Sequence, residues 1–213
     1  MIKNVLFDLD GTIINSKEGI VNAFNHALKS MNIEYNGNMD NFIGPPLNDT
    51  FKNVFNLSEA DTIYAMKKFR EYYKEKGVGE SELYKGIKDL IIELKNSNKK
   101  LILATSKAEV FAKQTLQIHE IKEYFDFISG ATLDSSRVKK ADVIKYAIDS
   151  NNLNIDECIM VGDRAEDIRG ANQNNMKSIG VLYGFGSLNE LQDAGANYIA
   201  KDINELKEIL YKI

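Results

Sequence analysis

Two aspartates stand two residues apart at the end of a short apolar run near the start of the chain. The run is Asn4–Phe7, and it is followed by Asp8, Asp10, Gly11 and Thr12. A continuous run of β-branched and aliphatic residues is typical of a strand buried on both faces. Two carboxylates there repel each other and lose hydration unless a cation or a proton compensates their charge. The pair therefore predicts a bound metal ion, and Gly11 permits a tight backbone turn beside the ligand.

A second acidic cluster follows another apolar run. Gly162 and Asp163 come directly after residues 158–161, and Asp167 lies about one helical turn further on. If the two strands are neighbours, as right-handed crossovers permit, Asp163 reaches the sheet edge that carries Asp8. Oxygen ligands beside a phosphate substrate favour Mg²⁺. The competing interpretations are a helix N-cap for Asp163 and a first-turn acid, favoured by the helix dipole, for Asp167.

Two further segments offer groups to a phosphate. Thr105 and Ser106 follow the apolar run 101–104, where their hydroxyls and the first amides of a helix would bind an anion. Thr105 as a mere N-cap stays a live alternative. Lys139 and Lys140 stand at the start of another predicted helix, and a lysine there could neutralise both a nucleophile and a transferring group. The alternative is that both are ordinary surface lysines.

The elements that must position these residues alternate along the chain. Strand-like runs recur at residues 4–7, 101–104, 125–128, 158–161, 177–181 and 197–200, and helical periods lie between them. This alternation predicts an α/β fold with a doubly wound, parallel, Rossmann-like sheet. Capping boxes at Ser187 with Glu190 and at Asp202 with Glu205 predict two helix starts.

Residues 16–83 interrupt the alternation. Two helical patterns occur there with no convincing strand between them, Ile20, Phe24, Ala27, Leu28 and Met31, then Ile63, Met66, Phe69 and Tyr73. Turn-forming residues flank the segment, and both prolines of the chain fall inside it in Gly44-Pro45-Pro46. We therefore expect a helical cap of residues 16–83, able to hinge over a core made of residues 1–15 and 84–213.

The composition limits the classes of function. The 213 residues are 44% hydrophobic and 27% charged, as in ordinary globular proteins, and the net charge of −4 offers no basic field for nucleic acid or an anionic membrane. The single cysteine, Cys158, lies in an apolar run, which predicts a buried, inert thiol and fits a reducing compartment. No apolar run approaches the ~18 residues of a spanning helix. We expect a cytoplasmic protein, a monomer or a dimer, that binds neither nucleic acid nor a membrane.

With these residues in view, the chain resembles the haloacid dehalogenase-like hydrolase superfamily, specifically its phosphoglycolate phosphatase-like branch with a helical cap. Asp8 to Thr12 match the first motif, Thr105 the second, Lys140 the third, and Gly162-Asp163 with Asp167 the fourth. The resemblance implies a Mg²⁺-dependent phosphatase that hydrolyses a small phosphate monoester, either phosphoglycolate-like or a 5′-nucleotide. It covers essentially the whole chain.

The resemblance also implies roles for individual residues. Asp8 would be the nucleophile, Asp10 the general acid and base, Thr105 a phosphate ligand and Lys140 a charge clamp. The metal would be held by Asp8, the backbone carbonyl of Asp10 and Asp163, with Asp167 supporting the metal's waters. Substrate contacts are expected from Gly11, Thr12, Thr105 and Ser106. Gly44 and Pro45 lie near the place where resembling proteins carry substrate-sensing residues, and the alternative is that they form only a loop between cap helices.

Departures from the family pattern leave some alternatives open. The family usually has proline after its lysine, but Ala141 follows Lys140 here, so the choice between Lys139 and Lys140 rests on the spacing to the next motif residue. Asp142 stands at the offset expected after Lys140 and favours that lysine. A carboxylate at position 10 suits hydrolysis or mutase chemistry, because both need a proton donor for a leaving oxygen. The rival functions are therefore a sugar-phosphate mutase of the same fold and a catalytically silent binding module.

Overall fold

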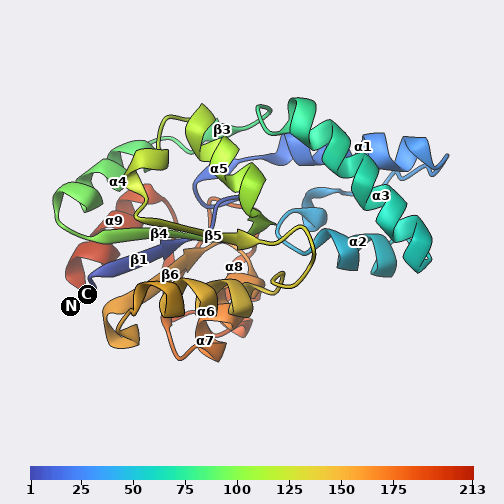
Figure 1. The fold of residues 1–213 in the computed structure, drawn as a ribbon. Helices are drawn as coiled ribbons and strands as arrows, with labels where there is room; N and C mark the ends of the chain where they lie inside the picture. The colour runs from blue at the N-terminus through green and yellow to red at the C-terminus, as the bar shows by residue number, and fades with distance from the viewer.

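A six-stranded parallel sheet forms the centre of the molecule (Figure 1). The computed structural model describes residues 1–213, the side chain of Asn41 excepted. The strands, in the spatial order β5-β4-β1-β6-β7-β8, are β1 (Asn4–Phe7), β4 (Lys100–Ala108), β5 (Phe127–Ala131), β6 (Cys158–Gly162), β7 (Lys177–Val181) and β8 (Tyr198–Ala200). All six predicted strands are present, although β5 begins two residues later than expected.

Helices cover both faces of this sheet. One face carries α4 (Ile87–Asn96), α5 (Glu109–Ile118) and α9 (Ile203–Lys212), and the other carries α6 (Lys140–Asn151) and α7 (Ala165–Gln173), with α8 (Leu188–Asp193) packed on α7. Side chains of β1 alternate between the layers, since Val5 and Phe7 pack with α4 and α9 while Leu6 packs with α6. Burying each such side chain contributes about 1.5–3 kcal/mol. The predicted doubly wound fold is confirmed.

Strand β1 lies at the point where the chain changes direction across the sheet. Phe7 pairs with Leu103 of β4 on one side and with Val161 of β6 on the other. Ligands of open α/β sheets bind beyond the carboxyl ends of strands at such a switch point, because the flanking helices diverge there. Asp8 and Asp163 directly follow two strands that end at this place, and Thr105 lies in β4, two residues beyond the partner of Phe7.

The segment between the first and second core strands is mainly helical and lies beyond the carboxyl ends of the sheet (Figure 1). Its helices are α1 (Lys17–Ser30), α2 (Leu47–Asn53) and α3 (Glu59–Tyr72), with a 3-10 turn at Asp40–Phe42 and a π-helical turn at Tyr73–Gly77. Phe24 is the centre of a separate hydrophobic cluster, with its ring centroid 5.3, 5.2 and 5.0 Å from those of Phe42, Phe51 and Phe69. Ile63 belongs to the helical pattern expected here but is 62% exposed, because α3 turns Ala65 and Phe69 inward.

A two-stranded antiparallel sheet joins this segment to the core. It consists of β2 (Ile14–Asn15) and β3 (Glu82–Leu83). The sequence predicts no strand here, because two residues are too few to show an alternation of apolar and polar side chains. The pairing holds the entry and exit chains of the helical segment side by side, at the places where hinges were expected.

Cys158 is buried in β6, and burial raises the pKa of its thiol to about 11. The predicted burial of the thiol is confirmed, and a raised pKa makes the reactive thiolate scarce near neutral pH. No helix in the described part of the chain has the length and apolar character needed to cross a membrane.

Candidate active site

Three buried aspartates meet at the carboxyl edge of the sheet. Asp8 follows β1, and its amide donates to the Val161 carbonyl at 2.9 Å, which ties it to the neighbouring strand. Asp163 follows β6, and Asp167 lies in the first turn of α7. One carboxylate oxygen from each of the three lies within 4.8 Å of the other two. The structure thus brings Asp163 to the edge that holds Asp8, as the strand order requires.

Asp163 is held by neutral donors. The Thr12 hydroxyl donates to its Oδ1 at 3.3 Å and the Phe185 amide donates to its Oδ2 at 2.8 Å. The N-cap of α7 is Arg164, so the interpretation of Asp163 as a helix cap is wrong. Asp167 does accept the Arg164 amide at 3.0 Å, which leaves its other oxygen directed to the cluster.

Lys140 lies between two of these carboxylates. Its Nζ is 2.7 Å from Asp8 Oδ1 and 2.8 Å from Asp167 Oδ1, and it donates to the Ala104 carbonyl at 3.1 Å. Burial lowers the pKa of the ammonium, but Asp167 and Asp8 outweigh burial and raise it above its ordinary value. Lys139, the N-cap of α6, is exposed. The structure therefore places Lys140 in the site and leaves Lys139 outside it.

The electrostatics of the cluster call for a divalent cation. Burial raises the pKa of Asp8 to about 6, with a smaller rise from Asp167, against the lowering by Lys140. Burial is also the main cause of the raised pKa of Asp163, followed by Asp167 and Asp8. When all three carboxylates are ionised, the single ammonium leaves two negative charges uncompensated. A divalent cation removes that deficit.

The surroundings of the carboxylates fit Mg²⁺. All donors are oxygens, and the main-chain carbonyl of Asp10 accepts no hydrogen bond from the residues that the structure describes. A Cβ atom on Gly11 or Gly184 would lie 2.1 or 2.5 Å from Asp163 Oδ2, and one on Gly162 would lie 2.3 Å from Asp167 Oδ2. Bare backbone therefore packs against the carboxylates and makes a cradle that a side chain would fill.

Asp10 is paired with Lys107, a lysine that the sequence motifs did not single out. Lys107 Nζ lies 2.7 and 3.0 Å from the two carboxylate oxygens of Asp10, and 4.6 Å from the ring centroid of Tyr73. Burial lowers the pKa of Lys107, but Asp10 and Tyr73 outweigh it and raise the pKa. Tyr73 belongs to the helical segment, so this contact couples that segment to Asp10.

The phosphate-binding loop differs from its sequence prediction. Thr105 and Ser106 lie within β4, and α5 begins only at Glu109 with Ala108 as its N-cap. Thr105 is therefore not a helix N-cap, and the helix amides lie further along the chain than expected. The Thr105 hydroxyl accepts the Lys107 amide at 3.2 Å, which leaves its hydrogen available to a ligand.

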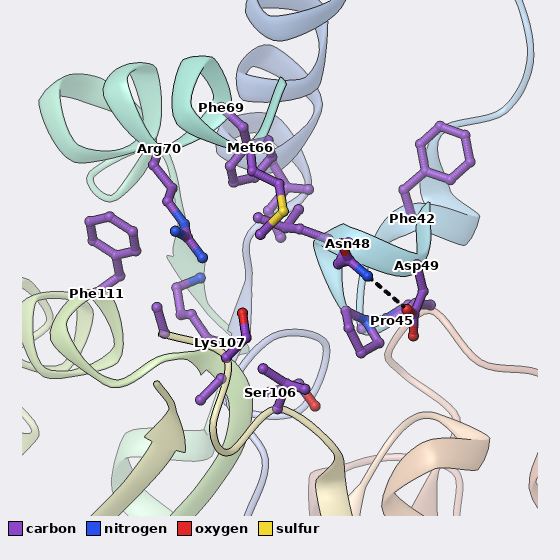
Figure 2. Close-up of a pocket in the computed structure, with 18 of the residues that line it drawn as sticks. Phe42, Pro45, Asn48, Asp49, Met66, Phe69, Arg70, Ser106, Lys107 and Phe111 are labelled. Atoms are coloured by element: carbon purple, nitrogen blue, oxygen red, sulfur yellow. Dashed lines mark hydrogen bonds between the residues drawn. The ribbon is translucent and has the colours of Figure 1, made fainter. Parts of the chain in front are cut away.

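A cavity of about 360 Å³ lies between the sheet edge and the helical segment. Asp8, Asp10, Thr105 and Ser106 line its core side, and Gly44 and Pro45 line the other. Figure 2 shows Ser106 and Lys107 below, Arg70 and Met66 from α3 above, and Pro45 with Asn48 opposite. Gly11 and Thr12, also predicted to contact substrate, are packed against Asp163.

The loop around Gly44 is docked on the core. Gly44 has φ +106°, and a Cβ there would lie 2.9 Å from Arg164 Cγ. The Arg164 guanidinium donates to the Ile43 carbonyl at 2.8 Å and to Glu190 at 2.8 Å. Arg164 thus links the helical segment to the loop that carries Asp163.

A family model described as haloacid dehalogenase-like hydrolase matches residues 5–181. The match spans both acidic clusters and the lysine between them. The chain belongs to the haloacid dehalogenase-like hydrolases. The resemblance expected from the motifs is confirmed.

Relatives of this haloacid dehalogenase-like hydrolase carry different names. A 5′-nucleotidase of Pseudomonas aeruginosa is 35% identical over 209 residues, 97% of this chain and 95% of that protein. Tyrosine-protein kinase PtkA of Mycobacterium tuberculosis is 33% identical over 210 residues, 97% of this chain and 72% of that protein. The crystal structure of a "predicted phosphatase" from Clostridium acetobutylicum matches with a TM-score of 0.98 at 42% identity, covering 100% of both chains.

Lys107, Tyr73, Arg164 and Arg70 are site residues of this haloacid dehalogenase-like hydrolase that sequence reasoning missed. A signal existed for Lys107, because residues two apart on a strand share a face and Thr105 was already a candidate. No comparable signal existed for Tyr73 or Arg164, because they meet Lys107 and Ile43 only after the helical segment has docked, nor for Arg70, which only lines the cavity.

Substitution of Gly11 by alanine should distort the acidic cluster. Gly11 has φ +83°, and the new Cβ would lie 2.1 Å from Asp163 Oδ2. We expect the free energy of unfolding, measured by urea denaturation, to fall by about 1–3 kcal/mol. Gly79→Ala is the control, because its Cβ would meet only the Lys76 carbonyl at an ordinary 3.5 Å. Equal effects of the two substitutions would contradict the role of Gly11.

The metal-free haloacid dehalogenase-like hydrolase should lose stability as pH rises through the acid range. Because the pKa of Asp8 rises from 3.8 to about 6 on folding, the folded state binds more protons in that window, and ionisation above it favours unfolding. We expect a loss of up to about 3 kcal/mol between roughly pH 4 and 6, with Asp163 acting in the same direction. Urea denaturation of the protein in a chelator, at several pH values, measures this change in the free energy of unfolding.

His119 acts in the opposite direction, because burial lowers its pKa from 6.5 and its share of stability rises with pH. The comparison protein is therefore Asp8→Asn, which keeps His119 and lacks the Asp8 contribution. Identical pH dependence in the two proteins would show that Asp8 is not responsible.

Proposed function

We propose that this chain is a Mg²⁺-dependent phosphatase that hydrolyses a small phosphate monoester through an aspartyl phosphate on Asp8. The observation that carries the proposal is the buried cluster of Asp8, Asp163 and Asp167 around Lys140, at the floor of a cavity. The chain is a phosphoric monoester hydrolase, in keeping with its relatives named 5′-nucleotidase and phosphatase.

Asp8 is the nucleophile. Its carboxylate attacks phosphorus in line with the departing oxygen, and Lys140, 2.7 Å away, holds the carboxylate in one orientation. The Thr105 hydroxyl donates to a phosphoryl oxygen, because its own oxygen is already occupied by the Lys107 amide. Asp8, Asp163 and Asp167, with the Asp10 carbonyl, would hold Mg²⁺, which when bound neutralises charge on the phosphoryl oxygens and on the carboxylates.

Asp10 moves the protons. It donates one to the leaving oxygen in the first half-reaction and removes one from the attacking water in the second. Lys107 contacts both carboxylate oxygens of Asp10, so this ammonium must shift away before Asp10 can hold a proton. An entering phosphate dianion gives Lys107 another partner and thereby releases Asp10.

Residues 16–83 act as a cap over a core of residues 1–15 and 84–213. The short β2–β3 pair is the hinge, and the cap reaches the core through Tyr73 at Lys107 and through Ile43 at Arg164. Closing these contacts excludes water while Asp8 is phosphorylated, and opening them releases the product.

Water is the final phosphoryl acceptor in this proposal. The same aspartyl phosphate could pass its group to a hydroxyl, which is mutase chemistry, so the fate of the phosphoryl group must be measured. Phosphoglycolate-like esters and 5′-nucleotides are the two substrate classes to compare.

The test is a screen of phosphate esters of both classes with Mg²⁺ and with a chelator. We expect release of inorganic phosphate that requires Mg²⁺. Transfer to a second hydroxyl without net phosphate release would favour the mutase, and no turnover of any ester would overturn the proposal.

A further inference from the structure

Arg70 is a cation of the cap with no counter-charge. It lies in the last turn of α3, lines the cavity and is half-buried. Figure 2 shows its guanidinium directed down into the cavity, toward Lys107 on the opposite wall. Burial lowers its pKa and no acidic group opposes this effect. No carboxylate in the described part of the chain forms an ion pair with it.

The other cations around the cavity are neutralised. Lys107 is paired with Asp10, and Lys52 is paired with Glu59. Asp49 is on the other side of the cavity, is exposed to water and contacts Asn48, so it forms no ion pair with Arg70 (Figure 2). The cap side of the cavity therefore carries one positive charge that the protein leaves unmatched.

We propose that Arg70 is a specificity-determining residue, which binds a second oxyanion of the substrate in addition to the scissile phosphate. The inference rests on the proposed function, because Asp8 fixes the phosphate at the floor of the cavity. A guanidinium presents a planar fork of donors that matches a carboxylate or a phosphate. Near Arg70 the cavity walls include Met66, Phe69 and Phe111, so the carbon chain between the two anions meets apolar surface.

This assignment narrows the substrate class. The preferred substrate is a phosphate monoester whose leaving alcohol carries a carboxylate or a further phosphate. A nucleoside 5′-monophosphate has no such group and would leave Arg70 half-buried without a partner. The cavity of about 360 Å³ leaves room for the chain that separates the two anions.

The experiment compares matched substrates with matched variants. The substrates are ω-carboxyalkyl phosphates and alkanediol bisphosphates of increasing chain length, each against the ω-hydroxyalkyl phosphate of the same length. The variants are Arg70→Met, which removes the charge, and Arg70→Lys, which keeps the charge without the fork. Lys67→Met is the control, because Lys67 is an exposed cation of the same helix that does not line the cavity.

In the wild type we expect the doubly anionic esters to be preferred. Arg70→Met should lower kcat/KM for them by about 10- to 100-fold and change kcat/KM for the ω-hydroxyalkyl phosphates by less than about twofold. Arg70→Lys should recover part of the loss, and Lys67→Met should behave as wild type. The carboxylate and bisphosphate series tell which oxyanion Arg70 binds. An equal loss for charged and neutral esters, or no loss for either, would overturn the assignment.

A binding measurement separates this inference from the proposed function. Calorimetry with the Asp8→Asn protein, Mg²⁺ and the same ω-carboxyalkyl phosphates needs no turnover. Suppose that Arg70→Met weakens the binding of the ω-carboxyalkyl phosphates to the Asp8→Asn protein, but the wild type releases no phosphate. The anion site then stands and the phosphatase proposal fails. If the wild type releases phosphate but Arg70→Met does not change the affinity for the ω-carboxyalkyl phosphates, the anion site is wrong and the phosphatase proposal stands.

Discussion

Replacing Asp8 by asparagine should lower the rate of phosphate release by at least about four orders of magnitude, because the substitution removes the attacking atom while preserving shape. Asp8 is buried and its carboxylate is held by Lys140 at 2.7 Å, and an amide in its place cannot form an acyl phosphate. Released phosphate, measured with Mg²⁺ and the best ester of the screen, gives the ratio of rates. Acid-quenched wild-type protein, reduced with borohydride, should carry homoserine at position 8, since reduction of an acyl phosphate yields an alcohol.

Two controls separate lost chemistry from lost structure. Asp149→Asn removes an exposed carboxylate of α6 that is paired with Lys145, and it should keep wild-type activity. Asp8→Asn should also stay folded in thermal melting, because it replaces a buried carboxylate by a neutral group of the same size. If folded Asp8→Asn retains activity within about tenfold of wild type, another group is the nucleophile.

Much of the fold could be predicted because the core strands are continuous apolar runs. Burial on both faces leaves that pattern in the sequence, and the polar residue after each run then falls at the sheet edge. Asp8 and Asp163 could be placed in this way with no knowledge of helix geometry. The two-residue strands β2 and β3 escaped because neither has enough residues to show a period.

The parts of the site that escaped prediction depend on long-range packing. Tyr73 meets Lys107 and Arg164 meets Ile43 only after the helical segment has docked, and no spacing in the sequence records that contact. The length of β4 is a different case. Its register with β5 shifts between Thr105 and Ala108, so the strand continues past the hydroxyl residues where a helix start was expected.

Substitution of Asp163 by asparagine should have opposite effects on stability and on Mg²⁺ binding. The Asp163 side chain is fully buried, and its donors among the described residues are the neutral groups of Thr12 and Phe185. In a chelator at neutral pH the variant should therefore melt a few degrees above wild type. An asparagine can keep both neighbours, because its oxygen accepts the Phe185 amide and its amide group faces the Thr12 hydroxyl. Removing the charge therefore removes a source of instability without leaving a buried donor unpaired.

Adding Mg²⁺ should reverse the order of the two proteins. A ligand at about 100 times its Kd stabilises the folded state by roughly 2.7 kcal/mol, about 5–10 °C in Tm for a chain of this size, and the wild type should show that rise. Asp163→Asn should show little of it, and its phosphate release should fall by about a thousandfold, whereas Asp149→Asn should respond as wild type does. The same Mg²⁺-dependent rise in Tm with and without the Asp163 carboxylate would mean that the ion binds elsewhere, and the two uncompensated charges of the cluster would then need another partner.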